Sequence, residues 1–113
     1  MTERLRASIE ASALMRRAEA AGDFAMVLRK GDEDRGALLL VIGSRGQHVA
    51  CLERILSLDQ GYRWQSTGPG AGAGSGEIAE FLAKRQRIDP DSWLIELDIA
   101  QPERFIAETT GEG

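Results

Sequence analysis

The run Ala37-Leu38-Leu39-Leu40-Val41-Ile42 is the longest unbroken apolar stretch of the chain. A strand with one solvated face alternates apolar and polar side chains, whereas a strand covered on both faces has no polar positions. The run is also far shorter than the roughly 20 residues that a membrane-spanning helix needs. It therefore predicts a central strand of a sheet, with other elements packed against both of its faces.

Residues 3–21, which precede this run, have the composition of a helix. They are rich in Ala, Leu, Arg and Glu, and Gly22 stands where a left-handed C-terminal cap belongs. Helical spacing gives this segment two apolar stripes, a broad one of Ala7, Ala11, Leu14, Met15, Ala18 and Ala21 and a second one of Leu5, Ile9 and Ala13. We expect one stripe to pack on the sheet, and the other to meet the C-terminal tail or another subunit.

Apolar segments separated by turn sequences predict four strands, at residues 24–29, 37–42, 48–56 and 62–66. The turn-rich breaks between them predict a hairpin of the first two strands followed by an antiparallel meander. A second helix is expected at 77–87, because Ile78, Phe81 and Leu82 have the spacing of a buried stripe.

Residues 93–99 predict a last strand that is half-buried. Trp93, Ile95, Leu97 and Ile99 alternate with Leu94, Glu96 and Asp98, so Trp93 is expected to anchor the core. Glu96 projects from the polar side, and if that side is covered it should have a basic partner. Beyond Pro102 only Phe105 and Ile106 are expected to anchor the tail, and residues 109–113 are expected to be frayed.

The predicted element order is α-β-β-β-β-α-β in a single domain, residues 1–113, with a mobile glycine-rich linker at 68–76. We predict an α+β fold with a mainly antiparallel sheet of four to five strands and two helices, and the run 37–42 favours helices on both faces. The linker does not contain a P-loop, which needs Lys and then Ser or Thr after its last glycine, where this chain has Glu77 and Ile78. Ser75 is expected to cap the second helix.

The charge balance gives no global attraction for nucleic acid or anionic lipid. The 113 residues include 14 Lys or Arg and 18 Asp or Glu, for a formal net charge of -4. No secretory signal is visible, so we expect a cytoplasmic protein without membrane contact. The lone Cys51 cannot form an internal disulfide, and its apolar neighbours indicate core packing.

No strong catalytic or metal-binding constellation is present. The single histidine, His48, lies three residues before Cys51, and in a regular strand this odd separation points the two side chains to opposite faces. One Cys with one His has no recognisable zinc spacing, so we expect no metal and no cofactor. Asp89 and Asp91 most simply form turn or capping bonds around Pro90. We therefore expect that the protein is not an enzyme.

Several motifs together carry a resemblance: Arg4-Leu5, Leu14-Met15-Arg16-Arg17-Ala18, Gly31-Asp32, Trp64, Gly68-Pro69 and, most specifically, Arg87-Ile88-Asp89-Pro90-Asp91-Ser92-Trp93 followed by Glu96. From Arg4 to Phe105 the chain resembles the bacterial family called domain of unknown function 1491. The resemblance implies a small stand-alone domain of α/β type with no established activity, so no site residue is carried over. The run 70–76 is richer in glycine than the family pattern and is a poor candidate for shared function.

The leading functional prediction is a non-enzymatic binding or adaptor domain that acts through a protein interface, including its own dimer interface. The candidate interaction surface comprises Arg16, Arg17, Arg29, Lys30, Asp89, Asp91 and Glu96. Of the adjacent arginines, Arg16 is expected to reach an interface carboxylate and Arg17 to lie on the polar side with Arg6 and Glu10.

The alternative is a nucleic-acid or nucleotide-binding accessory protein. It requires that the four basic residues Arg16, Arg17, Arg29 and Lys30 converge into one patch. A hydrolase that uses carboxylates such as Glu96 and Asp98 is a third and weaker alternative.

Overall fold

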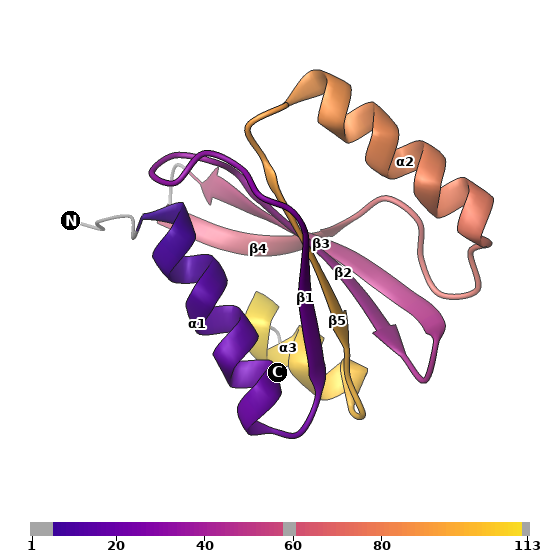
Figure 1. Cartoon of the computed structure of the whole chain (residues 1–113). Coiled ribbons are helices and arrows are strands. Elements are labelled where there is room, and N and C mark those ends of the chain that lie inside the picture. Colours follow the sequence, from indigo (N-terminus) through magenta and orange to yellow (C-terminus); the bar gives the residue numbers. More distant parts are fainter. Residues whose placement is uncertain (1–5, 58–60, 112–113) are drawn as a thin grey trace.

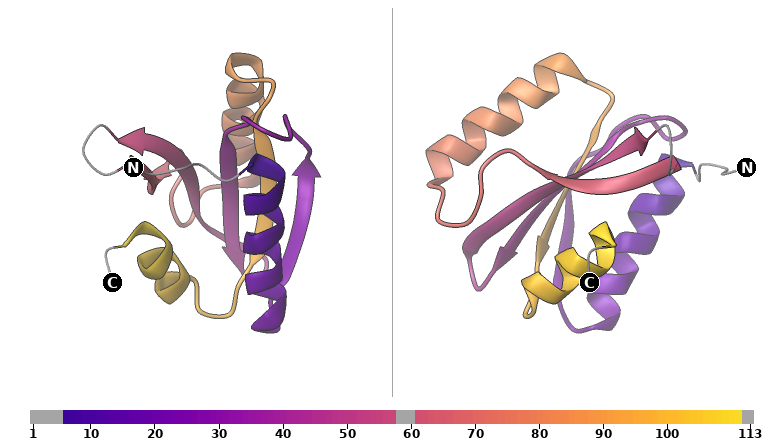
Figure 2. Two further views of the ribbon diagram at one scale, coloured as in Figure 1. Left: turned by 90° about the vertical axis from the view of Figure 1, so that its left-hand side faces the viewer. Right: turned by 180° about the vertical axis from the view of Figure 1, so that it is seen from behind.

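The computed structural model describes residues 6–57 and 61–111, which form a five-stranded sheet with helices on both faces (Figure 1). The elements in chain order are α1 (Ala7–Ala20), β1 (Phe24–Arg29), β2 (Leu38–Ser44), β3 (Gln47–Ser57), β4 (Gly61–Thr67), α2 (Ser75–Ile88), β5 (Trp93–Asp98) and α3 (Pro102–Thr110). Helices α1 and α3 cover one face and α2 lies on the other (Figure 2). The predicted α+β class and the coverage of both faces are confirmed. Within the described ranges, no helix is long and apolar enough to cross a membrane.

The order of strands across the sheet is β1-β5-β2-β3-β4, and the sheet is mixed. β2, β3 and β4 form the predicted antiparallel meander, and β1 pairs antiparallel with β5. The predicted hairpin of β1 and β2 is wrong, because β5 lies between them and runs parallel to β2. Insertion of β5 gives the apolar strand β2 a hydrogen-bonded neighbour on each side, as a central strand requires.

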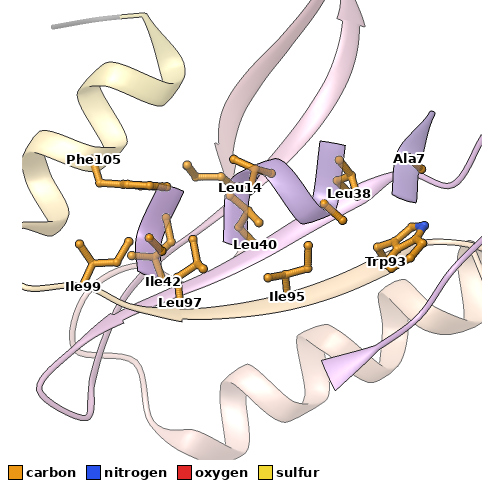
Figure 3. Close-up of a cluster of buried hydrophobic side chains, with 13 residues drawn as sticks. Ala7, Leu14, Leu38, Leu40, Ile42, Trp93, Ile95, Leu97, Ile99 and Phe105 are labelled. Atoms are coloured by element: carbon orange, nitrogen blue, oxygen red, sulfur yellow. The ribbon is translucent and has the colours of Figure 1, made fainter. Parts of the chain in front are cut away.

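The main core lies between α1, α3 and one face of β2 and β5 (Figure 3). Trp93 is 5% exposed and Leu38, Leu40, Ile95 and Leu97 are fully buried, so the prediction of Trp93 as a core anchor is confirmed. The broad stripe of α1 supplies Ala7, Ala11, Leu14 and Ala18 to this core. Ile9, from the second stripe, remains 47% exposed.

A smaller core lies between α2 and the opposite face of the sheet. Leu39 and Val41 of β2, Cys51 of β3 and Leu94 of β5 are buried there, and Phe81 and Leu82 of α2 pack against them. Successive residues of β2 thus enter different cores, which explains why the run 37–42 has no polar position.

The loop 31–36, which connects β1 to β2, contacts both the start of α1 and the start of β5. The backbone N–H of Ser8 donates to the carbonyl oxygen of Glu33 at 2.9 Å, which satisfies one of the free donors at the helix start. The indole N–H of Trp93 donates to the carbonyl oxygen of Asp32 at 2.7 Å. Gly31 is required here, because a methyl group in its place would overlap the Asp91 carbonyl oxygen and the Trp93 ring.

The C-terminal segment forms a third helix, α3, that the sequence analysis did not predict. Phe105 is buried and Ile106 packs against the main core, so both predicted anchors are confirmed. Residues 109 and 110, where fraying was expected, belong to α3, while 112 and 113 lie outside the described residues. The helix begins with Pro102 and ends at Gly111 in the left-handed conformation, φ 79°, and both are standard terminal signals.

The glycine-rich segment before α2 makes specific contacts. Gly68 has φ 65°, and a methyl group on it would overlap the ring of Phe81. The carbonyl oxygen of Pro69 accepts a hydrogen bond from His48 Nε2 at 2.9 Å. α2 begins at Ser75 with Gly74 as its N-cap residue and without a side-chain capping bond, so the predicted capping role of Ser75 is wrong.

Candidate functional site

A cavity of about 290 Å³ opens between the first half of α2 and the sheet, and we call it the Glu96 pocket. Its lining on α2 is Ser75, Ile78, Ala79 and Leu82, and its lining on the sheet and the β2–β3 turn is Val41, Gly43, Gly46, Gln47, His48, Glu96, Leu97 and Asp98. The walls are mostly apolar. The ionisable groups of the lining are two carboxylates and one imidazole, and Gln47 and Ser75 add an amide and a hydroxyl.

Glu96 is half-buried at this pocket and has no recorded partner. Within the described residues, 6–57 and 61–111, no hydrogen bond or ion pair reaches the Glu96 carboxylate. The expectation that Glu96 has a basic partner is therefore wrong for the described part of the chain. A carboxylate without a partner beside apolar walls favours a cationic group supplied from outside.

The other two ionisable groups of the pocket, Asp98 and His48, are held in place by the backbone. Asp98 accepts the N–H groups of Arg45 and Gly46 at 3.0 Å each, so its charge stabilises the turn between β2 and β3. A carbonyl oxygen can only accept, so in the His48 to Pro69 bond the proton is assigned to Nε2. In the neutral tautomer that carries this proton, Nδ1 is an acceptor.

His48 and Cys51 lie on the same face of the sheet, contrary to the prediction from their spacing. The pairing of β2 with β3 shifts between Ile42 and Gly43, whose partners are Ala50 and His48, so one extra residue of β3 bulges here. The bulge resets the alternation, and both side chains lie on the α2 side. Cys51 is fully buried, and this burial raises the pKa of its thiol to about 11, so it is not a nucleophile at neutral pH.

A bare apolar surface adjoins the Glu96 pocket on β1. In the pairing of β1 with β5, Phe24 lies opposite Asp98 and Met26 lies opposite Glu96, and cross-strand partners project to the same face. Phe24 is 50% exposed and Met26 is 43% exposed. We call Phe24, Met26, Glu96 and Asp98 the β1 shelf, which lies beside the part of the sheet that α2 covers.

A second and larger cavity, about 390 Å³, lies between the end of α1 and α3. Its charged groups have partners within the protein. Arg17 donates to Thr109 Oγ1 at 2.8 Å and lies over the Phe105 ring at 4.2 Å from its centroid, and Arg104 pairs with Glu108 at 3.5 Å. Because these charged groups already have partners within the chain, this cavity has less to offer a ligand than the Glu96 pocket.

The predicted basic residues do not gather into one patch. Arg17 lies in the last turn of α1, whereas Arg29 ends β1 and Lys30 follows it, just before the loop that contacts the start of α1. The helix rises by about 14 Å from Ser8, which contacts that loop, to Arg17. The convergence required by the nucleic-acid alternative is absent.

Three of these basic residues have partners within the chain. Arg17 joins α1 to α3 within the chain, whereas Arg16 is exposed and makes no polar contact in the described ranges, so its role at an interface stays a prediction. Arg29 donates to Ser92 Oγ at 2.8 Å, and Lys30 lies 3.9 Å from Glu33.

Asp89 and Asp91 act through their backbone. The carbonyl oxygen of Asp89 accepts from both the N–H and the hydroxyl of Ser92, and that of Asp91 accepts from the N–H of Asp32. No contact of either carboxylate is recorded among the residues described, so the capping role predicted for these side chains is not seen. Among all the residues that the structure describes, no group of three or more His, Cys, Asp or Glu side chains is placed to hold a metal ion.

Of the predicted surface, only Glu96 lies at the pocket. Sequence reasoning missed Phe24 and Met26, because the strand 24–29 reads as apolar at every position before Arg29 and shows no wet face. The sequence draws attention to His48 only through its spacing from Cys51, and no sequence signal marks the bulge that carries it to the pocket.

The comparisons with known proteins agree with this fold. The sequence profile described as "Protein of unknown function (DUF1491)" matches residues 5–107. A crystal structure of a DUF1491 family protein from Caulobacter crescentus has a TM-score of 0.75 at 29% identity, and the match covers 86% of this chain and 90% of that one. An NMR structure of a DUF1491 family protein from the same organism has a TM-score of 0.74 at 30% identity, and the match covers 87% of this chain and 88% of that one. A solution structure of a protein from A. tumefaciens has a TM-score of 0.71 at 31% identity, and the match covers 85% of this chain and 86% of that one. No curated protein matches the chain.

Proposed function

The chain belongs to the DUF1491 family, a family of unknown function, and we propose that it is a non-enzymatic, cytoplasmic protein-binding domain whose partner docks on the β1 shelf. The observation that carries the proposal is the exposure of Phe24 and Met26, at 50% and 43%, directly beside the half-buried Glu96. Large apolar side chains next to a pocket are typical of protein interaction sites.

The shelf has the two components that such a site needs. Phe24 and Met26 provide apolar area, and a methionine adapts to the shape of a partner. Glu96 and Asp98 add negative charge, which selects a partner with basic residues. β1 is also an edge strand of the sheet in the described structure, so a partner can approach from its open side without displacing a strand.

The experiment compares partner binding by two surface variants. Met26→Glu places a charge on the shelf, whereas Ile88→Glu makes the same kind of change at a 70% exposed site at the far end of α2, about 20 Å from Ser75. Proteins from the source cells are captured on the wild-type chain, and each candidate is then purified and titrated against the labelled chain by NMR.

We expect at least one partner that shifts the amide signals of Phe24, Met26 and Glu96 and that binds Ile88→Glu normally but not Met26→Glu. The proposal fails if every purified partner binds Met26→Glu as tightly as the wild type. It also fails if the shifts map to the cavity between α1 and α3.

A further inference from the structure

We propose that the Glu96 pocket receives a lysine side chain of the protein that docks on the β1 shelf, an inference that rests on the proposed function. The pocket opens where the shelf ends, because Glu96 and Asp98 belong to both. A partner lying across Phe24 and Met26 therefore has the pocket within reach of its side chains.

The size and walls of the pocket suit a single long side chain. Its volume of about 290 Å³ lies just below the roughly 300 to 1,000 Å³ of small-molecule and cofactor sites. Val41, Ile78 and Leu82 line it with apolar atoms, which can pack along an alkyl stem. Lysine combines such a stem with a compact charged head, and the lining that the described residues form holds no Phe, Tyr or Trp ring on which an arginine could stack.

The charges of the lining favour a cation. Glu96 has no recorded partner in the described part of the chain, and the charge of Asp98 is offset only by two backbone N–H groups. The N-terminus of α2 at Ser75 disfavours a cation, because the helix dipole there is equivalent to about half a positive charge. Glu77, in the first turn of that helix, offsets this positive charge. His48, the remaining titratable group of the lining, is an acceptor at Nδ1 when neutral.

The test uses n-butylammonium, which reproduces the end of a lysine side chain, and the full-length chain. Amide NMR signals of Gly43, Gly46, Leu97 and Asp98 report on occupancy of the pocket during the titration. Butyrate and n-butylguanidinium are titrated in parallel. Glu96→Gln removes the charge of the pocket, and Glu80→Gln removes the same charge from an exposed position of α2 outside the lining.

We expect saturable shifts at these four amides with n-butylammonium, weakened about tenfold or more by Glu96→Gln, because a hydrogen bond to a charged group is lost. Glu80→Gln should leave the affinity within about twofold of wild type, since exposed charges interact weakly. Equal binding of butyrate, tighter binding of n-butylguanidinium, or equal effects of the two variants would overturn the assignment.

The outcomes also separate this inference from the proposed function. If n-butylammonium does not bind but Met26→Glu still abolishes binding of a partner, the lysine assignment fails and the docking surface stands. If n-butylammonium binds in the pocket but no partner depends on Met26, the pocket is a site for free amines, and both the docking surface and the lysine assignment fail.

Discussion

The buried ion pair between Arg54 of β3 and Glu10 of α1 allows a quantitative test of the main core. The side chains are 3% and 20% exposed, so both charges are largely removed from water. The guanidinium also donates to the Gly36 carbonyl oxygen at 3.4 Å and lies over the Tyr62 ring at 5.2 Å from its centroid. Removing one partner of a buried ion pair is costly, because the other charge cannot return to water.

The perturbation is Glu10→Ala, which keeps a strong helix former in α1 while removing the carboxylate. We expect the free energy of unfolding to fall by about 3 to 4 kcal/mol, the lower part of the range for breaking a buried pair, because Glu10 is only partly buried. Domains of this size are stable by about 5 to 15 kcal/mol, so the variant should still fold.

Urea unfolding followed by tryptophan fluorescence measures the change, with equal m-values required for comparison. Glu19→Ala is the matched control, because Glu19 is exposed on the same helix, and it should change stability by less than about 0.5 kcal/mol. Arg54→Met combined with Glu10→Ala should cost clearly less than the sum of the two single changes. A loss below about 1 kcal/mol for Glu10→Ala would show that this pair is solvated and refute the reasoning.

Trp93→Ala should lower the free energy of unfolding by about 3 to 5 kcal/mol, because removal of the buried ring leaves a cavity in the core. A melting temperature of the variant within a degree or two of wild type would contradict this. Burial raises the pKa of the Cys51 thiol from an ordinary value near 9.0 to about 11. Wild type should therefore lose about 3 kcal/mol of stability relative to Cys51→Ala as the pH rises from about 9 to 11, and parallel pH profiles of the two proteins in urea titrations would refute this. Gly68→Ala should cost about 2 kcal/mol or more, because of its positive φ and the overlap with Phe81. Gly72→Ala, where φ is 88° but nothing lies within 4 Å, should cost about 1 kcal/mol, and equal melting of these two variants would exclude a packing role for Gly68.

Local patterns determined most of the elements. Strand β1 was predicted at its observed bounds, and β2, β3, β4, α2 and β5 within a few residues, because alternation and helical spacing are short-range properties of the chain. The run 37–42 also predicted a central strand with covered faces, because a half-exposed strand would carry polar side chains. α3 was predictable in principle from Pro102 and Gly111.

Strand neighbours and the candidate site depended on tertiary structure. The position of β5 between β1 and β2 follows from long-range pairing, and turn sequences report only on what is adjacent in the chain. The same pairing places Met26 beside Glu96, and the bulge in β3 carries His48 to the pocket. The sequence by itself determined which segments form strands and which side chains are apolar, whereas the fold decided which apolar side chains stay exposed, because exposure depends on what α2 leaves uncovered.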